Sequence, residues 1–540
     1  MRRWVIGAVV VALIAAGVIQ GSAIVRERAR RESRREAIAL VDRWLLLWSR
    51  SDWPAMRVLA EAPPRSLETT YESAFETLGV EKARFRHGPV RYEGDDPGAT
   101  FSAELELNGF GSFRYDGRLP IHRRDGEWRV RWTPEALHPL LTESRRFNRA
   151  RQFAPRAPLL DANGDPLSTR DVDIATIAGT VGPATPEQAA KLGAPYRAGN
   201  VVGQSGLQLA FERQLAGAPA GELRVVEDSG EAVETLLRSG GEAPAAVQLG
   251  IDPRLQQLAG QALQGVAQPA ALVAIDAPSG EVRAIVSRPV GGFPRAMQGR
   301  YPPGSTFKIV TATAALASGQ SPDGIVQCPP EARVGGRAFV NAEGEALGAI
   351  PFRTAFFRSC NTAFINVATG LAADALDNAA ATFGFDGYEL DVSAFTASFP
   401  APQDAVERAA SAIGQARVEA SPVHMATVAA AVASGTWRAP RLVRSAPPGP
   451  ENVLPAGVAT TLREFMRLVV TSGTGTEANV AGEPVHGKTG TAEFGTRQPP
   501  ETHAWFVGFQ GDLAFAVLVE GGGFGGEVAA PLAARFLRSL

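Results

Sequence analysis

Ser305 and Lys308 lie three residues apart, directly after a Pro-Pro-Gly run that cannot sit inside a helix. Residues 309–316 are apolar and rich in alanine, which predicts a helix that begins near Ser305. Side chains three residues apart share a helix face, so a hydroxyl would stand beside an amine. A desolvated lysine can take the proton of a serine and activate it as a nucleophile. The free N–H groups of the helix end would suit a developing oxyanion.

A Ser-x-x-Lys pattern alone is common, and an N-capping Ser305 with a solvated Lys308 would explain it without catalysis. Two further segments favour the catalytic interpretation over the capping one: Ser359-Cys360-Asn361 and Lys488-Thr489-Gly490-Thr491. Ser-x-x-Lys, Ser-Asp-Asn and Lys-Thr-Gly are the joint signature of penicillin-binding proteins and class A β-lactamases. All three occur here in that order, with Cys360 at the variable position of the middle motif.

The chain therefore resembles a class B penicillin-binding protein, a monofunctional D,D-transpeptidase, most sharply over its last half. The resemblance implies that Ser305 attacks the carbonyl between the two terminal D-alanines of a peptidoglycan stem peptide while Lys308 accepts its proton. D-alanine leaves, and the amine of a second stem peptide then attacks the acyl-enzyme to form the cross-link. Ser359 would relay a proton to the leaving nitrogen, and Asn361 would hold Lys308 and the substrate amide. β-Lactams would acylate the same serine.

The last motif is implied to bind the substrate carboxylate. Lys488 would supply positive charge near it, and Thr489 and Thr491, on either side of Gly490, would offer hydroxyls. The backbone N–H groups of Ser305 and Thr491 would form the oxyanion hole. The resemblance implies no cofactor and no metal.

The elements that must position these motifs fall in residues 251–540. Asp252-Pro253 is typical of a helix start, and 271–276 with 281–287 predict a hairpin. Further strands are predicted at 504–509 and 513–520, the strand that carries Lys488 at 485–492, and a helix at 531–540. One β-sheet sandwiched with helices matches the penicillin-recognising transpeptidase fold.

The preceding residues predict two smaller domains and complete a multidomain α+β protein. In the first of these domains, predicted helices come before predicted strands. The helices are predicted at 36–49, near Trp53-Pro54 and at 67–78, and the strands at 83–92, 100–107, 111–119 and 128–132. This order indicates an α+β unit and resembles the NTF2-like domain of some class B proteins. The next region resembles the elongated pedestal of class B proteins, a dimerisation-type domain. Its sequence predicts a strand, an Asn-Gly turn and a second strand at 156–167, a helix at 208–215 and a linker at 239–246. The predicted boundaries are 1–32 for an anchor with its basic flank, 33–140, 141–250 and 251–540.

The N-terminus carries an uncharged run at 4–25, long enough for one transmembrane helix. A cleaved signal peptide is the alternative, because Gly21-Ser22-Ala23 could be a cleavage site. A basic flank follows the run, and its members are Arg26, Arg28, Arg30, Arg31, Arg34 and Arg35. Such a flank normally marks the cytoplasmic side, whereas the resemblance places the catalytic domain outside the cell membrane as a single-pass protein.

Net charge and histidine spacing argue against nucleic-acid and metal binding. A net charge of −2 provides no positive potential that would attract nucleic acid. No two of the six histidines have the spacing of a pair of metal ligands. The only cysteines, Cys328 and Cys360, can pair in an oxidising compartment or remain two buried thiols.

Other functions share these motifs. A β-lactamase or β-lactam sensor could carry them, and a D,D-carboxypeptidase differs only in using water as the acceptor. A non-enzymatic scaffold would not need Ser305, Lys308 and Lys488 together. By resemblance, the partners of the chain are stem peptides ending in D-Ala-D-Ala, β-lactams and a membrane glycosyltransferase of the SEDS type.

Overall fold

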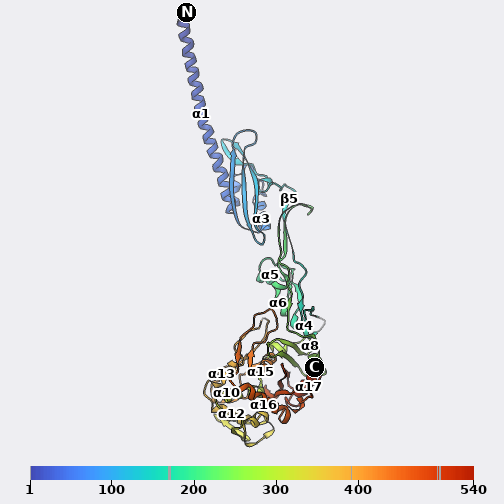
Figure 1. Cartoon of the computed structure of the whole chain (residues 1–540). Coiled ribbons are helices and arrows are strands. Elements are labelled where there is room, and N and C mark those ends of the chain that lie inside the picture. The colour runs from blue at the N-terminus through green and yellow to red at the C-terminus, as the bar shows by residue number, and fades with distance from the viewer. Residues whose placement is uncertain (1, 168–171, 391, 496, 498–499) are drawn as a thin grey trace. The chain divides into compact units, whose positions relative to one another are not determined.

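The computed structural model describes residues 2–167, 172–390, 392–495, 497 and 500–540, with side chains from Ile24 onward apart from Gln152 and Val172. The chain forms two compact units (Figure 1). The first unit contains residues 1–155, 188–197 and 217–243, and the second contains 156–187, 198–216 and 244–540. The region 141–250 therefore contributes to both units.

The first unit places helices against an antiparallel sheet, as the sequence predicts. Its helices are α1 (Arg2–Ser49), α2 (Trp53–Leu59) and α3 (Leu67–Leu78), and its sheet runs in the order β1 (Val80–Arg91), β2 (Gly98–Leu107), β3 (Gly111–Arg124), β4 (Glu127–Val130). Trp44 and Trp48 from α1 are fully buried with Tyr71 from α3, and Trp53 packs edge-on against Phe75. The apolar face of α1 thus supplies part of the core of this unit.

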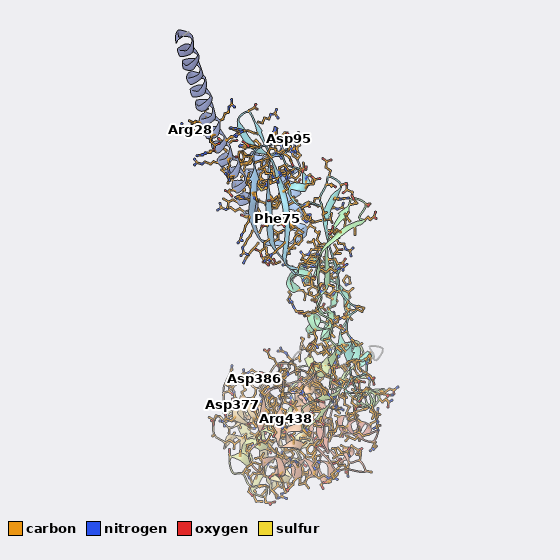
Figure 2. The ribbon with its side chains drawn as sticks, turned by 45° about the horizontal axis from the view of Figure 1, so that its top comes forward. Arg28, Phe75, Asp95, Asp377, Asp386 and Arg438 are labelled. Atoms are coloured by element: carbon orange, nitrogen blue, oxygen red, sulfur yellow. A yellow bond between two sulfur atoms is a disulfide. The ribbon has the colours of Figure 1, made fainter. Side chains whose placement is uncertain are left out.

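The predicted membrane span at 4–25 lies almost entirely before the first described side chain. Among the residues that the structure does describe, no helix is long and apolar enough to cross a bilayer. The six arginines of the basic flank all lie exposed on α1, among them Arg28 (Figure 2).

The region predicted as a pedestal departs from the sequence prediction in two places. At 156–167 the two predicted strands are reduced to a bridge between Leu160 and Pro166, and β6 (Leu159–Leu160) also pairs, in parallel, with β11 (Val247–Gln248). The predicted helix at 208–215 is two short helices, α6 (Gly206–Ala210) and α7 (Glu212–Ala216). The buried Glu212 carboxylate binds Arg156 and the Gly203 N–H, so tertiary contacts override the local helical pattern.

Three more strands of this region lie in the first unit. They form an antiparallel sheet in the order β10 (Ala232–Ser239), β9 (Ala220–Glu227), β5 (Arg145–Gln152).

The second unit is built around a five-stranded antiparallel sheet. The strand order is β13 (Val282–Arg288), β12 (Ala270–Asp276), β24 (Leu513–Val519), β23 (Glu501–Gln510), β22 (Val485–Phe494). The helix α15 (Pro422–Ser434) packs on one face, and α8 (Pro253–Ala262) with α17 (Ala529–Leu537) packs on the other. Both faces are buried, which explains the near-continuous apolar strands. The predicted sheet sandwiched with helices is confirmed, and β22 lies at its edge.

A helical insert between β13 and β22 carries the first two motifs. Its helices include α10 (Lys308–Ala317), α11 (Phe352–Phe357), α12 (Asn361–Thr369) and α16 (Val458–Ser472). Short strands, among them β14 (Ile325–Cys328), connect these helices.

Candidate active site

Ser305 lies in a 3₁₀ turn, Gly304–Phe307, that leads directly into α10. The turn touches the edge strand β22 so closely that a Cβ on Gly304 would lie 2.8 Å from the Thr491 carbonyl oxygen. Gly304 also has φ +54, a conformation that glycine adopts without strain. Glycine at this position is therefore what allows Ser305 to stand beside the Lys-Thr-Gly strand.

Lys308 opens α10 and is fully buried beneath Ser305. Its Nζ lies 2.9 Å from Ser305 Oγ and donates to Ser359 O at 2.7 Å and to Asn361 Oδ1 at 2.6 Å. Burial, with a smaller effect from nearby Lys488, lowers the pKa of Lys308 well below that of a free lysine. The sequence alternative of a solvated Lys308 is wrong, and the amine is poised to accept a proton.

Ser359 joins the two lysines. The chain reverses between α11 and α12 with Ser359 at φ +61, which is sparsely populated for a residue with a side chain. This conformation directs Ser359 Oγ to within 3.2 Å of Lys308 Nζ and lets it accept a hydrogen bond from Lys488 Nζ at 2.8 Å. Local strain of this kind persists only where surrounding contacts hold it.

The third motif lies on β22, against the 3₁₀ turn. Lys488 is fully buried, and burial lowers its pKa to about 7. Thr489 Oγ1 lies 2.5 Å from Thr474 Oγ1, and Thr491 Oγ1 accepts a hydrogen bond from the Gly525 N–H. A Cβ on Gly490 would lie 2.8 Å from Thr306 Cγ2, so this glycine also permits the close approach.

The structure thus brings together every residue that the sequence singled out. They are Ser305, Lys308, Ser359, Asn361, Lys488, Thr489, Gly490 and Thr491. A nucleophile and a buried amine with a lowered pKa share one side of the arrangement, and a second amine with two hydroxyls lies on the other. Such a site can perform acyl transfer. The individual roles of these residues stay predictions.

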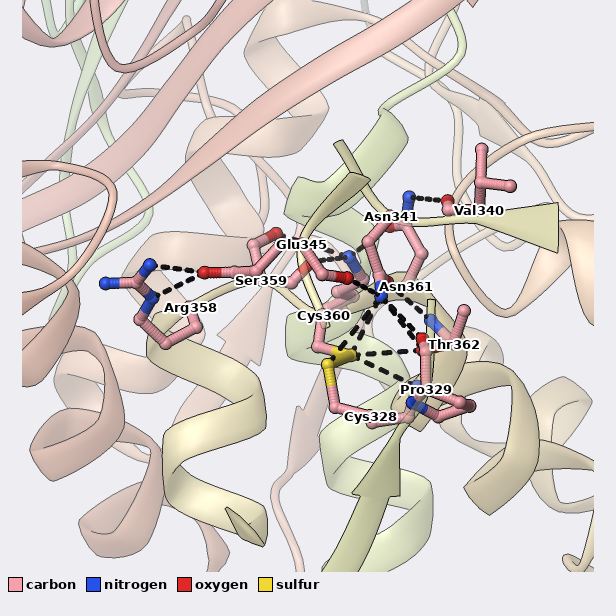
Figure 3. The surroundings of a disulfide bond; sticks show 12 residues. Cys328, Pro329, Val340, Asn341, Glu345, Arg358, Ser359, Cys360, Asn361 and Thr362 are labelled. Atoms are coloured by element: carbon pink, nitrogen blue, oxygen red, sulfur yellow. Dashed lines mark hydrogen bonds and ion pairs between the residues drawn. A yellow bond between two sulfur atoms is a disulfide. The ribbon is translucent and has the colours of Figure 1, made fainter. Parts of the chain in front are cut away.

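Sequence reasoning missed two neighbours of the site and left the pairing of two cysteines open. Thr474 beside Thr489 carries no recognisable motif, and neither does Asn341, whose buried side chain contacts the start of α12. Cys328 and Cys360 form a disulfide with a Cα–Cα distance of 6.2 Å (Figure 3). Of the two open possibilities for the cysteines, the structure has the pair.

The disulfide is expected to stabilise the second unit rather than to shape the helix start. Cys360 Sγ caps α12 by accepting the Ala363 N–H, and a serine can accept the same bond. We expect Cys328→Ser/Cys360→Ser to lose about 3–4 kcal/mol of stability, because the cross-link closes a 32-residue loop. Thermal unfolding of the full chain would show this as a transition several degrees lower. Reduced wild-type protein should match the variant, and an unchanged transition would contradict the expectation.

Three families match successive parts of the chain. Residues 36–145 match the NTF2-like N-terminal transpeptidase domain, 169–249 the penicillin-binding protein dimerisation domain, and 270–538 the penicillin-binding protein transpeptidase domain. Peptidoglycan D,D-transpeptidase PbpA of Mycobacterium tuberculosis is 34% identical over 350 residues, which cover 52% of this chain and 70% of that protein.

Two solved structures share the architecture. Pseudomonas aeruginosa PBP2 in complex with WCK 5153 superposes with a TM-score of 0.61 at 25% identity, covering 73% of this chain and 96% of that one. The ceftriaxone acyl-enzyme complex of M. tuberculosis penicillin-binding protein A gives a TM-score of 0.52 at 27% identity, covering 56% and 80%.

Proposed function

Because the chain belongs to the penicillin-binding protein transpeptidases, we propose that Ser305 is the nucleophile with which it cross-links peptidoglycan stem peptides. The chain is a serine-type D,D-transpeptidase, and the observation that carries the assignment of the nucleophile is the contact between Ser305 Oγ and Lys308 Nζ. Ser305 places its hydroxyl 2.9 Å from a buried amine with a lowered pKa. Unlike the Ser359 hydroxyl, which also contacts buried amines, it lies between two close approaches that glycines permit, at Gly304 and Gly490.

In the acylation step, Ser305 Oγ attacks the carbonyl carbon of the penultimate D-alanine while Lys308 takes the hydroxyl proton. Asn361 Oδ1 and Ser359 O accept two N–H bonds of Lys308, which leaves the lone pair of the deprotonated amine free to face Ser305 Oγ. The bond to the terminal D-alanine breaks as Ser359 passes a proton to its nitrogen and receives in exchange the proton that Lys308 holds. The amine of a second stem peptide then attacks the acyl carbon, forms the new peptide bond and gives its proton, through Lys308, to the released Ser305 oxygen.

The developing oxyanion needs two aimed N–H donors. We assign them to Ser305 and Thr491, whose backbones the contact between Gly304 and Thr491 brings together. Lys488, Thr489 and Thr491 bind the substrate carboxylate, and a β-lactam acylates Ser305 by presenting its carboxylate and strained carbonyl in the same way. The acyl-enzyme structure of the related penicillin-binding protein A supports this proposal.

The acceptor distinguishes this function from its nearest alternatives. Purified full-length protein is incubated with a stem peptide that ends in D-Ala-D-Ala, with and without a D-amino-acid acceptor, and the products are separated by mass. A transpeptidase transfers the acyl group to the acceptor amine. Release of D-alanine with only hydrolysed peptide would indicate a carboxypeptidase, and turnover of a bound penicillin within seconds would indicate a β-lactamase.

We further propose the setting of this reaction from the family resemblance. Residues 1–32 form a single-pass anchor that holds the catalytic domain outside the cytoplasm, followed by an NTF2-like domain at 33–140, a pedestal at 141–250 and the transpeptidase domain at 251–540. The glycan strands come from a membrane partner of the SEDS type. The matches to the NTF2-like and dimerisation families support this domain order.

A further inference from the structure

Asn341 is a buried amide that joins three segments next to the middle motif (Figure 3). Its Nδ2 donates to Pro329 O at 2.9 Å, just after β14, and to Glu345 O at 2.7 Å in its own loop. Its Oδ1 accepts the Thr362 N–H at 3.0 Å, in the first turn of α12. Both N–H groups of the amide therefore have acceptors, and only 4% of the residue is exposed to solvent.

The first turn of α12 depends on these contacts. A helix leaves its first N–H groups without partners inside the helix, so other groups must satisfy them. Here Asn341 Oδ1 takes the Thr362 N–H and Cys360 Sγ takes the Ala363 N–H. Thr362 is itself fully buried, and its hydroxyl donates to the same Pro329 carbonyl that Asn341 binds. Removing the Asn341 amide would leave a buried N–H unpaired and free the helix start to move.

Asn361 is held through the same loop. Its Nδ2 donates to Val340 O at 3.1 Å, the carbonyl directly before Asn341, and its Oδ1 accepts from Lys308 Nζ. The Val340 carbonyl can bind only the donor side of the amide, so it fixes which end of Asn361 faces Lys308. If the 340–341 segment moved, the Asn361 amide would lose this orientation.

We propose that Asn341 is a positioning residue for acyl transfer: its buried amide fixes the first turn of α12 and thereby the orientation of Asn361 toward Lys308. The inference rests on the proposed role of Ser305 and Lys308. Asn341 touches none of the reacting groups and acts only through Asn361 and the α12 backbone.

The test measures acylation of the full-length protein by a chromogenic cephalosporin in a stopped-flow instrument, which separates the acylation rate constant from the noncovalent dissociation constant. We expect Asn341→Ala to lower the acylation rate constant about 10- to 100-fold, as small misplacements of a catalytic group do. The noncovalent dissociation constant should stay near that of wild type, because the carboxylate site on β22 is untouched.

Asn452→Ala is the matched control. Asn452 Nδ2 also donates to two backbone carbonyls, those of Ala381 and Thr382, and among the described residues its side chain hydrogen-bonds to no member of the three motifs. This variant should acylate like wild type. A rate constant for Asn341→Ala equal to that of Asn452→Ala would overturn the proposal.

A double-mutant cycle separates positioning from a general loss of stability. In an Asn361→Ala background, Asn341→Ala should cost little further acylation rate, because the residue through which it acts is already gone. Full additivity of the two losses would overturn the proposal. If Asn341→Ala fails to fold, Asn341→Ser replaces it with the same expectations. Wild-type protein that is not acylated at Ser305 would refute the proposed function itself, an outcome distinct from the failure of Asn341 alone.

Discussion

Replacing Ser305 by alanine is expected to abolish covalent labelling of the chain by a fluorescent penicillin. No other described motif residue combines a hydroxyl with Lys308 Nζ at 2.9 Å and a place beside Thr491 on β22. Without the nucleophile no acyl-enzyme can form, so cross-linking of a stem-peptide substrate should fall by roughly 10⁴–10⁶-fold. Labelled membranes separated on a gel give the readout.

Ser318→Ala provides the control for Ser305→Ala. Ser318 is exposed and follows the last residue of the same helix, α10, far from the motif end. This variant should label at the wild-type rate and hold the label for hours. Residual labelling of Ser305→Ala at a wild-type rate would mean that another side chain is acylated and that the mechanism is wrong.

Lys308→Met is expected to produce the second-largest loss, on the order of 10³-fold or more in the acylation rate constant. Methionine fills similar volume but cannot accept the Ser305 proton. The substitution should not unfold the protein, because it removes a buried amine whose charged form burial disfavours. Thermal unfolding and acylation kinetics measured on the same sample would separate the two effects.

The pH dependence of wild-type acylation provides an independent check on Lys308. A general base acts only in its neutral form, so the rate constant should fall as pH decreases through the lowered pKa of Lys308. The acidic limb should therefore lie well below the pH at which a free lysine titrates. Lys308→Met should lose this limb, and an identical limb in that variant would assign the titration to another group.

The catalytic motifs could be predicted from sequence because each is a short local pattern with a chemical reason for its residues. The order of Ser305, Ser359 and Lys488 along the chain then identified a family, and the family supplied the fold that brings them together. The paired hairpin of β12 and β13 was also predictable, since its strands are short apolar runs separated by a turn signal.

The contacts that support those motifs could not be predicted in the same way. Asn341 reaches Thr362 from a loop with no periodic pattern, and nothing near it in sequence points to α12. The break between α6 and α7 depends on Glu212 meeting Arg156, a partner distant in sequence. Whether Cys360 pairs with Cys328 depends on the separation of their backbones, which spacing along a chain does not determine.

Two buried amines that share the hydroxyl of Ser359 make the site a place where anion binding and proton uptake are linked. Burial lowers the pKa of Lys488 to about 7 and that of Lys308 well below that of a free lysine, so near neutral pH the two amines are less protonated than exposed lysines. A carboxylate that arrives beside Lys488 favours its charged form and raises its pKa. Binding of the peptide end therefore increases the protonation of Lys488, and the site gains positive charge as the anion arrives.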